Sequence, residues 1–316
     1  MWCVLGVAMS ACGPPAPDDV TFAFVGDSPY GTAAMASYPS IVASIDADPD
    51  VVFVAHAGDV RGGDTDCRDD VLRRTFELYQ QFDDPFWYTP GDNEWTDCHR
   101  LGGYLPAERL AFLRQLFFPR PGSTTGGLPM MVTTQATSGD PATAAYVEHT
   151  LFDRECATFG TVHVVGSSDG AEPWGSYPGD PATGRAAGDQ PDLRIAEFTA
   201  RRAAAVAWID RIFDQAAIAG SHAVFVMMQA EPSATDPEYA AVRERLLARA
   251  AAFDGPVMLG HGDQHTYVLT PDYGGVAGLT RLQVPGEQAA VDRWLRVTVR
   301  CGTDASFDVE TVIVGA

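Results

Sequence analysis

The side chains best placed to do chemistry in this sequence are aspartates that directly follow a glycine at the end of an apolar stretch. Asp27, Asp59 and Asp92 all have this setting, and a fourth apolar stretch ends in the polar sequence GHGDQH at 260–265. One such aspartate is usually a turn or helix-capping residue. Capping alone does not explain why four apolar stretches all end in polar residues of this kind. Carboxylates held close together repel and cannot all stay ionised, so the pattern predicts bound cations.

The segments around these residues alternate between strand and helix patterns, which predicts an α/β fold. In such sheets, ligands bind beyond the carboxyl ends of the strands, where the aspartates lie. Two stretches rich in glycine and proline, 119–145 and 169–192, are expected to be long loops. Expected strands cover 20–27, 51–59, 85–95, 146–152, 159–170, 222–232, 256–265, 294–301 and 306–314, and expected helices cover 31–47, 68–82, 106–118, 193–216 and 237–253.

Composition narrows the classes of protein to consider. The chain has 316 residues, with 46% hydrophobic and 20% charged residues, so a packed core is expected and wholesale disorder is excluded. It carries 42 acidic against 21 basic residues, a formal net charge of −21, and every basic residue is arginine. A nucleic-acid backbone needs dense cationic contacts, so nucleic acid is not an expected partner.

The first residues have the character of an export signal. Residues 1–12, MWCVLGVAMSAC, are apolar, uncharged and too few to span a bilayer. The run from Met9 to Cys12 resembles a bacterial lipobox, in which Cys12 would carry the lipid; an ordinary cleaved signal peptide is the alternative. We expect a leader and linker over 1–18, one domain over 19–316, and a periplasmic, cell-surface or secreted protein with no membrane contact except a lipid anchor.

Export changes how the cysteines are interpreted. Disulfides are the default in an oxidising compartment, and four cysteines follow the leader: Cys67, Cys98, Cys156 and Cys301. They allow three pairings. The sequence has no CxxC pair, so a structural zinc site is not expected.

The polar strand ends, taken in order, resemble the motifs of the calcineurin-like metallophosphoesterases. That family carries D-x-H, G-D, G-N-H-[ED], a lone His and G-H-x-H. This chain has Asp27-Ser28-Pro29, Gly58-Asp59, Gly91-Asp92-Asn93-Glu94, Gln229 and Gly262-Asp263-Gln264-His265. The resemblance covers about residues 20–316. The motif GDNEW looks like that of an exported bacterial branch of the family. It implies an α/β/β/α sandwich of two mixed sheets flanked by helices.

The resemblance also implies a ligand set for two divalent cations. Asp27, Asp59 and His265 would hold one cation. Asp59, Asp92, Gln229 and Asp263 would hold the other, with Glu231 as a possible substitute for Gln229 and His261 for Asp263. Oxygen donors outnumber imidazoles in this set, so we expect Mn²⁺ or Mg²⁺ to be favoured over zinc or iron.

The implied reaction is in-line attack on phosphorus by a water that the two cations activate. Asn93 stands where the family has its general-acid His, and Glu94 is the usual partner that orients a ligand. His99, with His261 next, is the candidate replacement acid; the alternative for His99 is a loop His bonded to backbone. Arg61 and Arg100 are candidates for binding phosphoryl oxygens, or else plain surface residues.

The strand-end positions favour one cysteine pairing. Cys67 and Cys98 follow the second and third motifs, and loops from neighbouring strand ends are adjacent, so we expect Cys67–Cys98 and, from the remainder, Cys156–Cys301. The expected function is metal-dependent hydrolysis of a small-molecule phosphoester outside the cytoplasm. The alternatives are a metal- or phosphate-binding lipoprotein that has lost catalysis, and a hydrolase of another bond.

Overall fold

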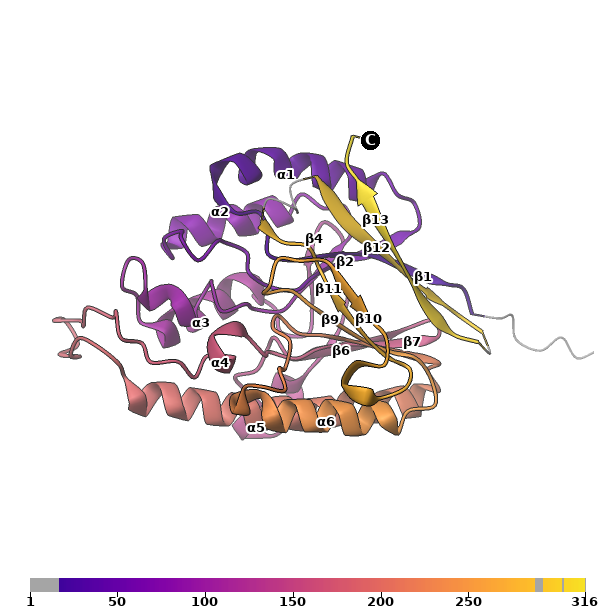
Figure 1. Cartoon of the computed structure of the whole chain (residues 1–316). Coiled ribbons are helices and arrows are strands. Elements are labelled where there is room, and N and C mark those ends of the chain that lie inside the picture. The colour runs from indigo at the N-terminus through magenta and orange to yellow at the C-terminus, as the bar shows by residue number, and fades with distance from the viewer. Residues whose placement is uncertain (1–16, 288–291, 303, 316) are drawn as a thin grey trace, which may run out of the picture.

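The computed structural model describes residues 17–287, 292–302 and 304–315 (Figure 1). Two β-sheets of six and seven strands pack face to face, and helices cover both outer faces. This arrangement confirms the expected sandwich of two mixed sheets flanked by helices. The expected leader, with Cys12, lies almost wholly outside the described residues.

The first sheet has the order β13-β12-β1-β2-β3-β4. Strands β1, β2 and β3 run parallel, so their carboxyl ends share one edge, while β4, β12 and β13 pair antiparallel with their neighbours. The bounds are β1 Val20–Val25, β2 Val51–His56, β3 Pro85–Tyr88, β4 Thr125–Gly126, β12 Arg293–Arg300 and β13 Ser306–Ile313.

The second sheet has the order β10-β11-β9-β8-β7-β6-β5. Its central strands β7, β8, β9 and β11 are parallel, and β5, β6 and β10 pair antiparallel at the sides. The bounds are β5 Thr133–Thr134, β6 Thr150–Arg154, β7 Ala157–Thr161, β8 Ala223–Met227, β9 Val257–His261, β10 Val268–Thr270 and β11 Leu279–Gln283.

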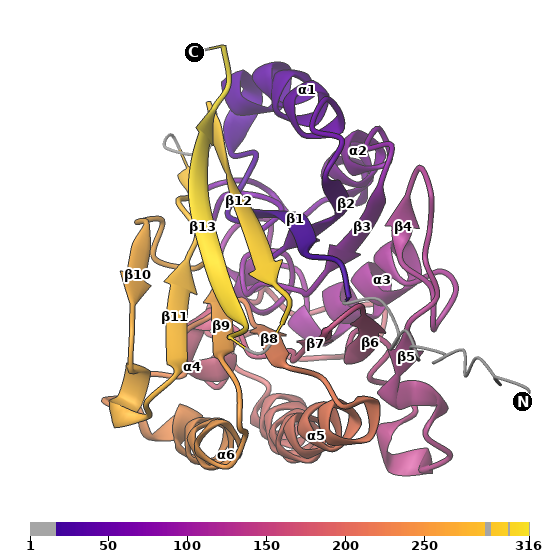
Figure 2. The same ribbon diagram turned by 90° about the vertical axis from the view of Figure 1, so that its right-hand side faces the viewer.

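The longer helices form the outer layers on both sides of the two sheets (Figure 2). Ile41, Leu72 and Leu113 anchor three of them on the first sheet, and Ile212 and Leu246 anchor two on the second. The first three are α1 Gly31–Asp46, α2 Asp69–Tyr79 and α3 Pro106–Phe117; the other two are α5 Pro191–Ala219 and α6 Ala240–Ala251.

Aromatic side chains fill the space between the sheets. Phe22 of β1 lies edge-on to Phe225 of β8 with ring centroids 4.9 Å apart, and Phe53 of β2 lies edge-on to Phe159 of β7 at 5.3 Å. All four rings are fully buried. Such pairs add directional contact to a large hydrophobic gain, so they fix how the two sheets face each other and therefore where their strand ends meet.

The expected elements match the structure well, with differences at their ends. Strand β3 stops at Tyr88, so residues 89–95, which were expected to belong to it, form irregular chain and turns that lead into a 3₁₀ turn at Thr96–His99. Strand β7 stops at Thr161 and is followed by a tight turn at Gly166–Asp169, α4. Strands β10 and β11 were not predicted, because their short runs lack a clear alternating pattern.

Both expected disulfides are confirmed: Cys67–Cys98 and Cys156–Cys301. Two such bridges are typical of proteins that fold in an oxidising, extracytoplasmic environment. Across the described ranges, no helix is both long enough and apolar enough to cross a membrane.

Candidate metal centre

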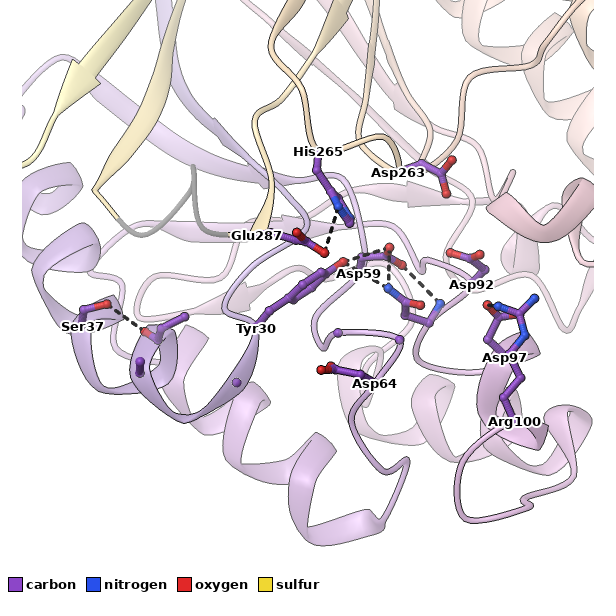
Figure 3. A pocket seen from close by; sticks show the side chains of 16 residues that line it. Tyr30, Ser37, Asp59, Asp64, Asp92, Asp97, Arg100, Asp263, His265 and Glu287 are labelled. Atoms are coloured by element: carbon purple, nitrogen blue, oxygen red, sulfur yellow. Dashed lines mark hydrogen bonds and ion pairs between the residues drawn. The ribbon is translucent and has the colours of Figure 1, made fainter.

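Side chains that follow three strand ends line one cleft of about 1180 Å³ (Figure 3). Asp59 and Asp92 follow β2 and β3, and Asp263 and His265 follow β9; all four line the cleft. Asp27, which follows β1, is fully buried and makes contact with this group through Asp263. The two sheets therefore bring together residues that are as much as 238 positions apart in the chain, from Asp27 to His265.

The acidic side chains form two overlapping sets that share Asp59. One ligand atom each from Asp27, Asp59 and His265 lie within 4.8 Å of one another, and so do atoms of Asp59, Asp92 and Asp263. Distances of this size allow three side chains to reach a common cation. The shared carboxylate would lie between two such positions.

Several of these residues have backbones in the left-handed region, which non-glycine residues seldom adopt. The φ angles are 49° at Asp27, 57° at Asp59, 75° at Asp263 and 60° at His265. Strained conformations persist only when the surroundings enforce them, and they cluster at functional sites. Here they turn each side chain back over the end of its strand.

Two glycines permit the close approach of the strand ends. A Cβ atom at Gly91 would overlap Asp59 Oδ1, and one at Gly262 would overlap Asp27 Oδ2. Each glycine therefore leaves the space that a neighbouring carboxylate occupies. This is the physical reason for the Gly-Asp pairing after β3 and for the glycine in GHGDQH.

Glu94 ties the ends of β2 and β3 together from behind the site. Its Oε1 accepts hydrogen bonds from the backbone N–H of Gly91 at 2.7 Å and of Asp59 at 3.1 Å, and from Tyr88 Oη at 2.7 Å. The side chain is fully buried. It supports Asp59 through the backbone and has no place in either ligand set.

The carboxylates of the cluster are not neutralised by arginine. Burial, reinforced by the other carboxylates, raises the pKa of Asp27, Asp59 and Asp92 well above the usual range. Within the described residues, neither these three nor Asp263 forms an ion pair with an arginine. A buried charge normally needs such a partner, so the donor set fits a cation that would restore the ionised forms.

Gln229, two residues after the end of β8, faces the cluster with its amide nitrogen. Nε2 donates to Asp92 Oδ1 at 3.1 Å and to Asp263 Oδ1 at 3.0 Å. Its Oε1 accepts from the backbone N–H of Gly166 at 2.7 Å. An amide nitrogen is a hydrogen-bond donor, so in this arrangement Gln229 bonds to two of the carboxylates that were predicted as ligands beside it, and its own oxygen is turned toward Gly166.

Asn93 lies at the cleft with Tyr30. Its Nδ2 donates to Asp59 Oδ2 at 2.8 Å and to Tyr30 Oη at 3.1 Å, and Tyr30 Oη donates to Asp59 Oδ2 at 3.1 Å. Burial and the neighbouring carboxylates raise the pKa of Tyr30 well above its usual value, so the phenol keeps its proton. Both side chains therefore present hydrogen-bond donors to Asp59.

Two predicted histidines lie outside the cluster. His99 Nδ1 accepts a hydrogen bond from the backbone N–H of Ser176 at 3.4 Å, and burial and Arg100 lower its pKa. His261 is fully buried between Arg281 Nε, at 3.0 Å, and the carbonyl of Gly262, and burial lowers its pKa to about 3. Neither ring lines the cleft, so the structure does not bring these two histidines to the cluster where they were predicted to act.

The possible substitute ligand Glu231 is also held elsewhere. Its carboxylate pairs with Arg281 at 2.7 Å and accepts from Tyr273 Oη at 2.9 Å. Both partners hold the side chain outside the cleft lining and outside both ligand sets. The second ligand set therefore consists of carboxylates alone.

Of the two arginines predicted to bind phosphate, the structure places only Arg100 at the cleft. Its guanidinium pairs with Asp97 and with Glu172, the latter at 3.1 Å, and part of it stays exposed. Arg61 is buried, with Nε donating to Cys67 Sγ at 3.1 Å and Nη1 to the carbonyl of Gly62. Arg61 therefore supports the loop after β2 and does not reach the cleft.

Sequence reasoning missed two residues beside Asp92. Asp97 is buried and lines the cleft, and Ser167 Oγ lies 3.0 Å from Asp92 Oδ2 and 2.9 Å from Asp97 Oδ1. The sequence GSSDG contains Ser167 and follows the buried strand β7, so the strand-end rule that found the aspartates could have found it. Asp97 shares a single turn with Asp92 and had no separate signal.

The Cys67–Cys98 bridge joins the loops that carry the shared ligand and Asp92. Cys67 belongs to the loop after β2, and Cys98 to the 3₁₀ turn after β3. Both sulfurs are fully buried. The bridge therefore limits how far the two strand ends can separate.

Comparison with known proteins finds solved structures that match the chain only at low identity and with TM-scores below 0.5. No family model and no curated protein matches the chain. Among solved structures, GAP50, the anchor in the inner membrane complex of Plasmodium, is 10% identical with a TM-score of 0.49, over 94% of this chain and 85% of that one. The 5'-nucleotidase from Candida albicans SC5314 is 11% identical with a TM-score of 0.45, over 95% of this chain and 53% of that one. This chain thus spans about half of the nucleotidase.

Proposed function

We propose that this protein hydrolyses a small-molecule phosphoester with the aid of two divalent cations, as a divergent member of the calcineurin-like metallophosphoesterases. The observation that carries the proposal is the pair of ligand sets that share Asp59. Side-by-side cations bridged by a carboxylate supply a water of lowered pKa and stabilise charge that develops on phosphoryl oxygens.

The ligands themselves define the cation preference. Asp27, Asp59 and His265 would hold one cation, and Asp59, Asp92 and Asp263 the other. Only one imidazole is present among these donors. Carboxylate oxygens suit Mn²⁺ and Mg²⁺ better than softer metals, so Mn²⁺ or Mg²⁺ is preferred over zinc or iron.

Arg100 is the residue that binds the substrate's phosphoryl group. It reaches the cleft from the turn after β3, and its guanidinium pairs with Asp97 and Glu172. A planar guanidinium can donate two parallel hydrogen bonds to phosphoryl oxygens. The two carboxylate partners fix its orientation before the substrate binds.

Asn93 stands where the family has a general acid, and it cannot fill that role. Its amide donates hydrogen bonds to Asp59 and Tyr30 but gives up no proton near neutral pH. Tyr30 holds its proton firmly for the reason given above. The departing oxygen therefore receives hydrogen bonding at most, and esters with good leaving groups are the preferred substrates.

We place this activity outside the cytoplasm. The two disulfides support an oxidising compartment. Lipidation at Cys12, which lies outside the described residues, would attach the protein to a membrane surface. The net charge of −21 argues against a nucleic-acid substrate.

A second candidate is a protein that binds cations or phosphate without turnover. The specific observation in its favour is that Gln229 and Asn93 both present amide N–H groups to ligands, Gln229 to Asp92 and Asp263 and Asn93 to Asp59. Amide donors partly satisfy these carboxylates without a cation. Such a protein would keep the fold and one cation site and would lack hydrolysis.

Metal content and hydrolysis, measured on the same preparation, separate the two. After loading with Mn²⁺ and dialysis, elemental analysis should find about two ions per chain. Nitrophenyl phosphate monoesters and diesters should be hydrolysed, and Asp59→Asn should lose both properties. Bound cations without turnover of any ester would favour the binding protein. Absence of bound cations would refute both the hydrolase and a cation-binding protein, and would leave phosphate binding as the second candidate.

A further inference from the structure

The turn that follows β7 has an unusual backbone. Ser167, Ser168, Asp169 and Gly170 have φ angles of 53°, 55°, 54° and 71°, so four successive residues adopt the left-handed conformation. Glycine adopts it freely, whereas the other three meet steric strain from Cβ. A run of this kind persists only when contacts on both sides hold it.

Buried side chains hold the turn in place. Arg201 of α5, which is fully buried, donates to the Asp169 carboxylate and to the Asp169 carbonyl. The same carboxylate accepts from the backbone N–H of Val165 at 3.2 Å. At the other end, the N–H of Gly166 donates to Gln229 Oε1. Both flanks of the turn are therefore fixed by groups that cannot reach water.

The turn presses against the second ligand set. A Cβ atom at Gly166 would overlap Asp263 Oδ1 and come into contact with Asp92 Oδ2. Ser167 Oγ lies 3.0 Å from Asp92 Oδ2, 2.9 Å from Asp97 Oδ1 and 3.2 Å from Arg100 Nη2. Ser168, in the same conformation, has no side-chain hydrogen bond to any described residue.

A hydroxyl group has one proton and two lone pairs. Ser167 can accept from Arg100 while it donates to one carboxylate at a time. Asp97 already has Arg100 as a partner, whereas Asp92 has only the amide of Gln229. Among the described residues, Ser167 is thus the side chain that links Asp92 to Arg100.

We propose that Ser167 is a positioning residue. It orients Asp92 toward the cation that Asp92 would share with Asp59 and Asp263, and it couples that ligand to the arginine that binds phosphate. The inference rests on the proposed function, because it assumes a cation at the second ligand set. The strained turn exists to bring this hydroxyl to Asp92.

Two glycine variants of the full chain provide a matched test. Ser167→Gly and Ser168→Gly each place glycine at a left-handed position and relieve the same strain, and only the first removes a hydroxyl from Asp92. Metal-free protein is titrated with Mn²⁺ by calorimetry, and bound ions are counted by electron paramagnetic resonance. The melting temperature of each variant is measured without metal.

We expect wild type and Ser168→Gly to bind two Mn²⁺ ions with the same affinities. Ser167→Gly should bind the first ion as wild type does and the second about 10–100-fold more weakly, the usual cost of losing a group that orients a ligand. Neither variant should melt below wild type.

Three results would overturn the inference. If wild type binds two ions and Ser167→Gly matches it, Ser167 does not position Asp92, and the proposed function stands. If Ser167→Gly weakens both ions equally and melts lower, its role is structural. If wild type binds no ion, the inference and the proposed function both fail.

Discussion

The acidic cluster and the region around Glu148 hold buried charge in opposite ways. Glu148 is fully buried, yet Arg114 and His163, at 2.5 and 2.8 Å, outweigh the effect of burial and hold its pKa well below the usual range. Asp59 and Asp92 are just as buried, have no such partner among the described residues, and have raised pKa values. The protein can pair a buried carboxylate with arginine, so the group of carboxylates without an arginine partner among the described residues supports the proposed cation site.

The same contrast appears in the strained turn. Asp169 is fully buried and is paired with Arg201, although burial still raises its pKa to about 6. Its neighbour Ser167 faces Asp92, which has no arginine. The same turn therefore contains a buried carboxylate, Asp169, that is paired with arginine, and a hydroxyl, Ser167, that faces the proposed ligand Asp92.

The largest expected effect is that of Asp59→Ala. Removing the shared carboxylate should abolish binding of both cations and lower kcat/KM by at least about 10²–10³-fold, the usual cost of one preorganised electrostatic group. Because repulsion is relieved, the metal-free variant should melt above metal-free wild type. Elemental analysis, kinetics and thermal melts measure this, and full metal occupancy in the variant would contradict the assignment.

The next effect concerns the missing general acid. The region around Glu148 contains His163, and the histidine that lines the cleft is the expected ligand His265. A general acid speeds the loss of a poor leaving group by about 10²–10⁴-fold. Because this protein lacks one, kcat/KM for nitrophenyl esters should exceed kcat/KM for alkyl esters by a larger factor than in an enzyme that has a general acid. Asn93→His should flatten the dependence on leaving-group pKa. His99→Ala, the control, should leave it unchanged because His99 faces Ser176; a flatter or steeper slope there would show that His99 takes part.

Breaking the paired region should cost stability and not activity. Arg114→Met leaves Glu148 buried beside His163 alone, and removal of one partner from a buried pair costs about 3–5 kcal/mol. Arg300→Met, a control at an exposed pair with Asp19 and Asp308, should cost about 0–1 kcal/mol. Urea unfolding measures both. Equal losses would show that the Glu148 region is not the compensated cluster described here.

A smaller effect links pH to cation binding. The raised pKa values of Asp27, Asp59 and Asp92 mean that the folded, metal-free protein holds protons that the unfolded chain releases above about pH 4. The stability they contribute is complete below that pH and is lost as pH rises toward the folded pKa values.

Mn²⁺ replaces those protons, so its stabilising effect should grow from pH 5 to pH 8. At a hundred times the dissociation constant it should reach about 2.7 kcal/mol for each ion. Thermal melts with and without Mn²⁺ at both pH values measure this. A metal effect that shrinks with rising pH would argue that protons and cations do not compete for the same carboxylates.

Much of the site could be predicted from sequence. Asp27, Asp59 and Asp92 were found because a Gly-Asp pair after an apolar run is a local signal of a strand end, and Asp263 and His265 were found at the polar end of a fourth apolar run. The α/β class follows from the alternation of strand and helix patterns, whereas the sandwich of two sheets was implied by the resemblance of the ordered motifs to the metallophosphoesterases. Both disulfides follow from the strand ends and from elimination.

Tertiary structure decided the roles that depend on orientation. Gln229 could have turned either atom of its amide to Asp92; the N–H of Gly166, from a different strand end, takes the oxygen. His99 and His261 lie within a few residues of ligands, yet Ser176 and Arg281 hold their rings elsewhere.

The left-handed turn that brings Ser167 to Asp92 depends on Arg201, which is 34 residues further along the chain. A strand end is specified locally, by hydrophobic periodicity and a glycine. The direction of a polar side chain is set by partners that only the packed fold brings within hydrogen-bonding distance. For this reason the sequence by itself determined where the candidate ligands lie, and only the tertiary structure decided which polar neighbours face them.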